Sequence, residues 1–76
     1  MNVYTFEVFV DGTPVKNYVN YFAAKRYSER FSQEQDVEIR YFLPHPNGAN
    51  FAPLPRGCDR REDGIWKHYD EVDTGD

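Results

Sequence analysis

The chain has 76 residues with a formal net charge of −4, and 17% of them are aromatic, so it forms one domain at most and its core must come largely from rings. The acidic balance argues mildly against a nucleic-acid-binding domain, which usually presents a basic face, and the single cysteine excludes an internal disulfide framework. No apolar run approaches the roughly 20 residues of a membrane span, and the first residues lack the basic start of a signal peptide.

Residues 2–10 predict the first strand, because alternate positions share an apolar face. The members of that face are Tyr4, Phe6, Val8 and Val10. The Asp11-Gly12 pair then predicts a tight hairpin, since a type I′ turn needs positive φ at both central positions. A short return strand is expected over Val15–Val19, with Pro14 at an edge or at the strand start. A longer loop running through Thr13 is an equal alternative.

One helix is predicted within residues 20–35, beginning at Phe22 or Ala23 and ending at Gln33, with Asn20 as its N-cap. Its apolar stripe has helical spacing and consists of Ala23, Ala24, Tyr27 and Phe31. The small alanines should let the helix approach the sheet closely. The opposite side of the helix is charged.

A second strand is predicted over Val37–Leu43 by strict alternation, and Pro44 ends it. Residues 44–64 then predict a long Pro- and Gly-rich loop, within which the charged segment 58–63 should be exposed. Residues 65–69 predict a last short strand, and residues 71–76 an acidic tail.

These elements predict one α+β domain over residues 1–70 in the order ββαβ(β). We expect a three- to four-stranded antiparallel sheet with one helix packed on one of its faces. Residues 2–10 and 37–43 are candidate neighbours in this sheet, and the strand order stays open.

The residues that could carry chemistry are too scattered to predict an active site. His45, His68 and Cys58 lack the paired spacing of a metal site, so neither a metal nor another cofactor is expected. Cys58 could pair with His68 for nucleophilic catalysis, but no local signature supports this, and a free thiol is the simpler interpretation. We therefore predict a protein that is not an enzyme.

Three surfaces could instead bind a partner. Lys25, Arg26 and Arg30 cluster on the exposed side of the helix, with Arg40 as a possible neighbour, and could meet phosphates or an acidic partner. The simpler interpretation of this pattern is a solvated helix face. The tail and the residue before it offer an acidic surface made of Asp70, Glu71 and Asp73, which could occupy a basic channel.

The third surface is the second face of the sheet, whose rings could stack on single-stranded bases or meet a protein, including a second copy of the chain. Its predicted members are Val3, Thr5, Phe9, Arg40 and Phe42. If this face is open, the acidic balance favours protein contact over RNA.

A short, acidic, ring-rich chain with a strand, an Asp11-Gly12 turn, a helix containing Ala24-Lys25-Arg26 and a return strand resembles the small proteins encoded by phages and mobile elements. In this layout it is similar to anti-CRISPR inhibitors of multi-subunit, type I complexes. The likeness covers Met1–Leu43 and leaves out the Pro-rich segment that follows. It implies a protein that blocks target-DNA binding or nuclease recruitment through a Lys/Arg helix or an acidic surface.

The predicted function is therefore a small, non-enzymatic protein-interaction module, encoded by a phage, that inhibits a nucleic-acid-handling complex in the host cytoplasm. A single-stranded nucleic-acid-binding domain, using the sheet rings and the basic helix, is the alternative.

Overall fold

The protein is an α+β domain with one five-stranded antiparallel sheet and one helix, and its structure is a computed structural model that describes residues 4–44 and 53–70. The elements are β1 (Thr5–Val10), β2 (Thr13–Tyr18), α1 (Tyr21–Ser28), β3 (Val37–Leu43), β4 (Leu54–Glu62) and β5 (Ile65–Asp70). The strand order is β2-β1-β3-β4-β5, so the predicted pairing of the first strand with the strand after the helix is confirmed. The acidic tail, with Glu71 and Asp73, lies outside the described residues.

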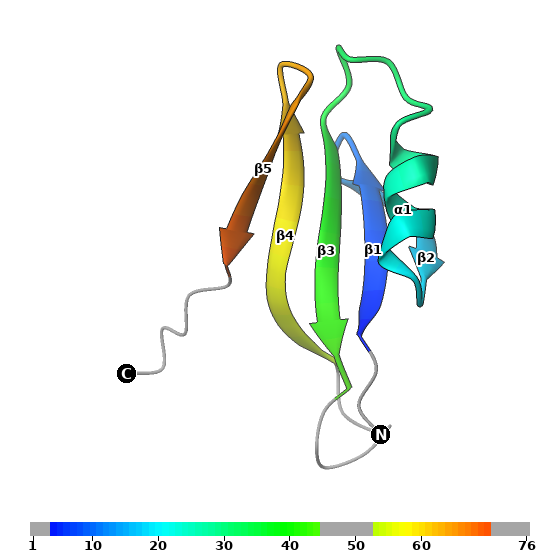
Figure 1. Ribbon diagram of the computed structural model, residues 1–76, viewed down its shortest axis with the longest axis vertical. Helices are drawn as coiled ribbons and strands as arrows, with labels where there is room; N and C mark the ends of the chain where they lie inside the picture. The colour runs from blue at the N-terminus through cyan, green and yellow to red at the C-terminus, as the bar shows by residue number, and fades with distance from the viewer. Residues whose placement is uncertain (1–3, 45–52, 71–76) are drawn as a thin grey trace.

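Helix α1 packs on β1, β2 and β3, while β4 and β5 extend the sheet beyond it (Figure 1). No helix in the described part of the chain is long and apolar enough to cross a membrane. The sheet therefore has one face that is partly covered by the helix and a second face that no described element covers.

The core lies between α1 and the two central strands, β1 and β3. Its buried members are Val8, Val10, Ala24, Val37 and Ile39. Ala24 is fully buried, which confirms that a small side chain brings the helix close to the sheet. Half-buried rings surround this small aliphatic centre, as the ring-rich composition predicts. They are Phe6, Tyr18, Tyr21, Tyr27, Phe31, Tyr41 and Trp66.

The β1–β2 hairpin turns on two residues, as the Asp-Gly pair predicts. Asp11 has φ 51° and Gly12 has φ 83°, which are the positive values of a type I′ turn. The return strand begins at Thr13, directly after the turn. Pro14 lies on β2, which is an edge strand, so its missing N–H costs the sheet nothing.

Substituting Gly12 by alanine should lower the free energy of unfolding by about 1 kcal/mol. A Cβ on Gly12 would meet no atom within 4 Å, so the whole cost would come from the positive φ. Chemical denaturation would measure it. Asparagine, which tolerates positive φ, should cost less than alanine at the same position, and equal losses would contradict this explanation.

Strand β4 corrects the largest error of the sequence interpretation, because nine residues of the predicted 44–64 loop form a strand between β3 and β5. Its early proline and glycine resemble a loop, but Pro55 and Gly57 flank a β-bulge, where such residues are tolerated. The predicted exposure of its charged segment holds for Arg60 and Asp63 but not for the residues that face the core. Asp59 and Arg61 are only 8% and 6% exposed, because both point to the side of the core.

Helix α1 is shorter than predicted and ends at Ser28 rather than Gln33, although Asn20 is the N-cap as expected and accepts a hydrogen bond from the Ala23 N–H. The chain after Ser28 forms turns instead. There the Ser32 side chain accepts a hydrogen bond from a backbone N–H, and so offers the backbone an alternative to the helix. Arg61 from β4 donates to the carbonyl oxygens of Ser32 and Gln35, so these groups are satisfied without further helical turns.

Candidate functional site

The structure separates the three basic side chains that the sequence places together on the helix. Lys25 turns toward the sheet, where its Nζ lies 4.8 Å from the ring centroid of Trp66 on β5. Arg26 and Arg30 lie on the opposite flank of the helix, where they line one shallow cleft. Arg30 follows the end of α1, and its guanidinium lies 5.6 Å from the Tyr27 centroid.

That cleft, which we call the basic flank cleft, has a volume of about 430 Å³ and lies beside the start of the helix and the end of β2. Its lining residues are Tyr18, Asn20, Phe22, Ala23, Arg26, Tyr27 and Arg30. Phe22 is 79% exposed, and Val19 nearby in the chain is 72% exposed. Two guanidinium groups thus border a surface with large apolar side chains in water, a composition typical of protein-binding sites.

Arg40 does not join the helix cations, because it lies on the opposite face of the sheet. Its guanidinium stacks on Phe9 at 3.9 Å from the ring centroid, and its Nε lies 2.7 Å from Glu38 Oε1. The predicted ring platform on this open face is therefore partly occupied, since Arg40 covers Phe9. Glu38 also adds negative charge where a nucleic-acid backbone would have to pass.

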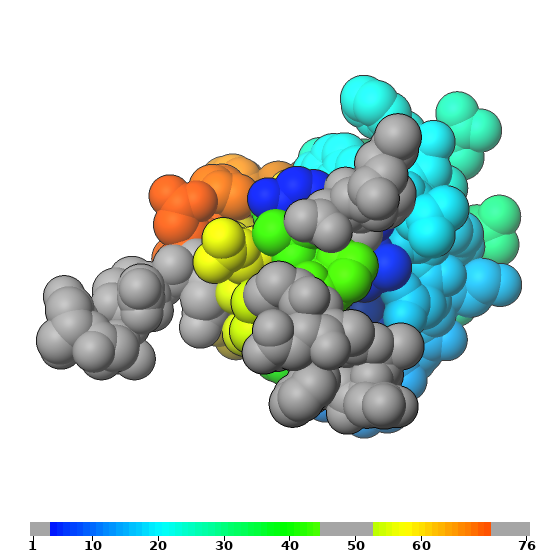
Figure 2. Space-filling view, turned by 90° about the horizontal axis from the view of Figure 1, so that it is seen from below, coloured from blue at the N-terminus to red at the C-terminus, as the bar shows by residue number. Residues whose placement is uncertain are grey.

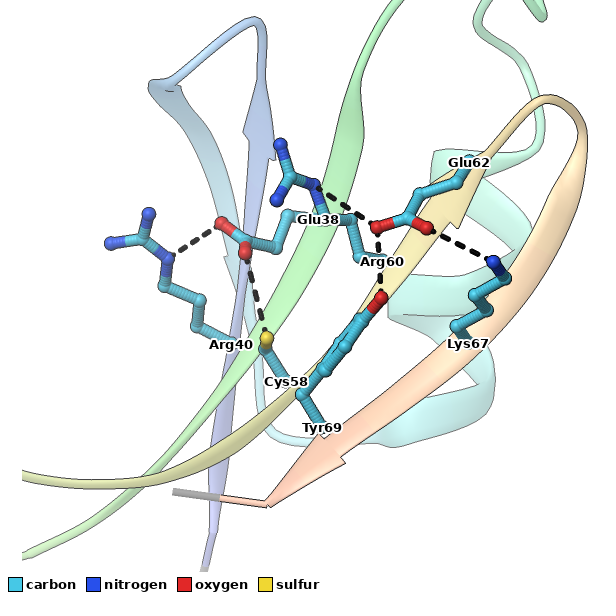
Figure 3. Close-up of polar contacts among 7 residues, drawn as sticks. All are labelled: Glu38, Arg40, Cys58, Arg60, Glu62, Lys67 and Tyr69. Carbon is cyan, nitrogen blue, oxygen red and sulfur yellow. Dashed lines mark hydrogen bonds and ion pairs between the residues drawn. The ribbon is translucent and has the colours of Figure 1, made fainter. Parts of the chain in front are cut away.

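The open face carries a second hub at Glu62, which is shown with the Glu38 contacts in Figure 3. Glu62 Oε2 accepts a hydrogen bond from the Tyr69 hydroxyl at 2.9 Å, and Oε1 lies 3.3 Å from Lys67 Nζ. Arg60 Nε is 3.9 Å from the same carboxylate. The cations of this face are thus engaged with carboxylates of the same face.

The hypothetical Cys58–His68 pair does not form. Cys58 is opposite Tyr69 in the β4–β5 ladder, and Asp59 is opposite His68, so the thiol and the imidazole lie on different faces of the sheet. Burial, followed by the hydrogen bond to Glu38, raises the pKa of Cys58 to about 11. The thiol is therefore protonated at neutral pH and is a poor nucleophile.

On the helix side of the sheet, Asp59 is the centre of a polar network that joins four elements. It accepts a hydrogen bond from the hydroxyl of Tyr21 on α1, and its Oδ1 lies 2.7 Å from Nδ1 of His68 on β5. Burial acts to raise the pKa of Asp59, but hydrogen bonds from Tyr21, from Tyr41 on β3 and from His68 outweigh it and lower the pKa. Burial and the bond to Asp59 raise the pKa of Tyr21 to about 12.

His68 lies between two carboxylates. Its Nε2 is 2.8 Å from Oδ1 of Asp70, and its ring stacks on Tyr41 with centroids 5.7 Å apart. The hydrogen bonds to Asp59 and then to Asp70 raise the pKa of His68, so the imidazolium form is favoured. The predicted acidic residue Asp70 is thus the partner of a histidine at the end of β5.

We expect the stability of the domain to depend on pH through this network. The contribution of protonated His68 is fully present below its unfolded pKa of 6.5 and is lost as the pH rises through its higher folded value. Asp59 acts in the opposite sense, since its contribution is present above its unfolded pKa of 3.8 and is lost as the pH falls through its lower folded value.

The denaturant midpoint of the wild-type chain should therefore be lower at about pH 9 than at about pH 6. The decrease should be smaller for His68→Gln, whose amide can still donate to Asp59 but does not titrate. An equal decrease in both proteins would assign the effect to another group.

Sequence reasoning missed Tyr21, Tyr41 and Asp59 as members of one site. It did single out His68, but with Cys58 as its partner. Residues 59–63 are all charged, so no alternation in the sequence marks this strand or its inner face. Among the described residues, no group of three or more acidic, histidine or cysteine side chains could hold a metal ion.

The two candidate sites are therefore the basic flank cleft and the helix-side network around Asp59. Comparisons of the chain with protein-family models, with curated proteins and with solved structures found no match.

Proposed function

We propose that this protein is a non-enzymatic interaction module that binds a host nucleic-acid-handling complex and inhibits it, in the manner of anti-CRISPR inhibitors of type I complexes. The observation that carries the interaction is the basic flank cleft, where exposed Phe22 lies with Arg26 and Arg30. The inhibitory role rests on the layout of strand, Asp-Gly turn and Ala-Lys-Arg helix.

The composition of the basic flank cleft favours a protein or phosphate-bearing partner. Aromatic and arginine side chains supply most of the binding energy at protein interfaces, and arginine is the side chain best suited to carboxylates and phosphates. Phe22 would enter an apolar pocket of the partner, while Arg26 and Arg30 would pair with its anions. Lys25 is directed to Trp66, so we assign it a smaller part than the sequence suggests.

The absence of catalysis is part of the same proposal. The raised pKa of Cys58 and its separation from His68 by the sheet remove the one nucleophile–base pair that the sequence offered. His68 itself has both ring nitrogens within hydrogen-bond distance of a carboxylate. Binding is thus the function that these residues support best.

The test is to add the purified chain to type I CRISPR surveillance complexes and to measure target-DNA binding and nuclease recruitment. We expect the chain to inhibit one of these steps. Phe22→Ala and the double variant Arg26→Ala/Arg30→Ala should each require about tenfold more protein for the same inhibition.

Matched controls come from other parts of the surface. Ile65→Ala removes an exposed apolar side chain from the far edge of the sheet, and Arg60→Ala/Lys67→Ala removes two cations from the open face. Both should inhibit like the wild type. Inhibition that survives the Phe22 and Arg26/Arg30 changes would place the contact elsewhere, and no effect on any type I complex would end the inhibitor proposal.

A further inference from the structure

A second cleft, of about 440 Å³, opens on the helix side of the sheet. It lies at the end of the molecule where β1 and β4 begin and β3 and β5 end, the end that faces the viewer in Figure 2. Its lining residues are Tyr4, Phe6, Tyr21, Tyr41, Arg56, His68 and Asp70. We call it the ring cleft. Its volume falls in the range of small-molecule sites, which is about 300–1,000 Å³.

One row of the sheet ladders positions three of the groups that line the ring cleft. The ladders align Phe6 with Tyr41, Tyr41 with Gly57, and Gly57 with Asp70. Since opposed residues share a face, this row places the two rings and the Asp70 carboxylate on the helix side. Helix α1 packs on β1, β2 and β3, so β4 and β5 extend beyond it.

The β-bulge of β4 explains why Arg56 lines the ring cleft. The register runs from Tyr41 opposite Gly57 to Phe42 opposite Pro55, which leaves Arg56 as the extra residue. Strict alternation would place Arg56 on the open face, since its neighbour Gly57 faces the helix side. It lines the ring cleft instead, and bulges are known to redirect side chains next to functional sites.

The apolar part of the cleft contains two stacked ring pairs, of which one includes the exposed ring of Tyr4. Tyr4 stacks on Phe6 at 6.3 Å, and Tyr41 stacks on His68 at 5.7 Å. Tyr4 is 44% exposed, so much of this ring surface is open to a ligand. The hydroxyl of Tyr21 donates to Asp59. The charged groups that line the edge of the cleft include Arg56 and Asp70.

We propose that the ring cleft binds a nucleotide, either free or as an unpaired unit of a single strand. The planar base would stack on the rings, its N–H groups would donate to the exposed Asp70 carboxylate, and its phosphate would pair with Arg56. Among the described residues, Arg56 forms no ion pair. This proposal does not depend on the inhibitor function.

Two other ligand classes fit less well. A cation such as a quaternary ammonium would suit the rings, but it would meet the Arg56 guanidinium, and the Asp70 carboxylate is already in contact with His68. An uncharged apolar ligand would cover Arg56 and Asp70 without pairing them, which is costly. A ligand with a planar ring, N–H donors and an attached anion would contact the aromatic rings, Asp70 and Arg56 at once.

The test is a titration of the full chain, labelled with ¹⁵N, with the four ribonucleoside monophosphates, observed by amide chemical shifts. We expect saturable shifts centred on the backbone amides of the lining residues. Guanosine and inorganic phosphate, titrated separately, should each bind more weakly than guanosine monophosphate, because each has only part of the recognised chemistry. A short single-stranded oligonucleotide distinguishes the two sources, since tighter binding of the oligonucleotide would identify a strand and equal binding a free nucleotide.

Two variants test the assigned contacts. Arg56→Ala should weaken nucleotide binding about tenfold or more and leave nucleoside binding unchanged, and Tyr4→Ala should weaken both about fivefold or more. Arg60→Ala on the open face is the matched control and should bind like the wild type. Both Arg56 and Tyr4 are exposed, and the dispersion of the amide spectrum would verify folding. The proposal is overturned if no nucleotide shifts these amides at millimolar concentration, or if Arg56→Ala binds as well as Arg60→Ala.

Discussion

Replacing Asp59 by alanine is expected to lower the free energy of unfolding by about 3 kcal/mol or more. The carboxylate is 8% exposed and accepts hydrogen bonds from Tyr21, on the helix, and His68, on the last strand. Its removal leaves the Tyr21 hydroxyl and the His68 Nδ1 without their shared partner. The loss is large for a chain of this size, whose total stability should be about 4–11 kcal/mol.

The result should be measured by equilibrium denaturation beside Glu62→Ala, which is a matched control. Glu62 also serves three donors, but on the open face and with a partly exposed side chain. Water can replace its partners there, so the loss should be clearly smaller than for Asp59. Equal losses would mean that burial does not determine how much these two networks contribute to the free energy of unfolding.

The parts of the fold that the sequence predicted are those with a regular apolar period. Val8, Val10, Val37 and Ile39 alternate along two strands, so the two strands and the apolar face of each could be inferred, and the strands could be named as candidate neighbours. Strand β4 could not be inferred in this way, because it fills the same face with Asp59 and other polar groups. It forms a strand because it is hydrogen-bonded to β3 on one side and to β5 on the other, and no local sequence pattern reveals such neighbours.

The candidate sites follow the same rule. The sequence correctly placed Arg26 and Arg30 at one surface, because the two residues are four positions apart. Tyr21, Tyr41 and His68 belong to three different elements, and only the strand order and the register bring them together. The face to which the Arg56 side chain points depends on a single β-bulge, because a one-residue change of register would direct it to the other face.

Replacing Arg61 by alanine should lower the free energy of unfolding by about 2–4 kcal/mol. Its side chain is 6% exposed, and its Nη2 donates to the Ser32 carbonyl at 2.5 Å. Arginine here connects β4 to the turns that follow helix α1, which contain Ser32 and Gln35. We therefore expect faster amide hydrogen exchange in residues 29–36 of the alanine variant than its loss of global stability explains.

Two further variants separate the hydrogen bonds of Arg61 from its packing. Arg61→Met keeps most of the buried stem and removes the donors, so it should cost about 1–3 kcal/mol, less than alanine, and still release residues 29–36 to exchange. Arg60→Ala, one residue away on the open face, should stay within about 0.5 kcal/mol of the wild type. If Arg61→Met exchanged like the wild type, the stem alone would hold the segment, and the early end of α1 at Ser28 would need a different cause. Slower exchange of residues 29–36 in Arg61→Met than in the wild type would show that the buried charge of Arg61 destabilises the fold. Arg61 Nε is buried without a partner among the described residues, so the desolvation of this group would then outweigh its hydrogen bonds.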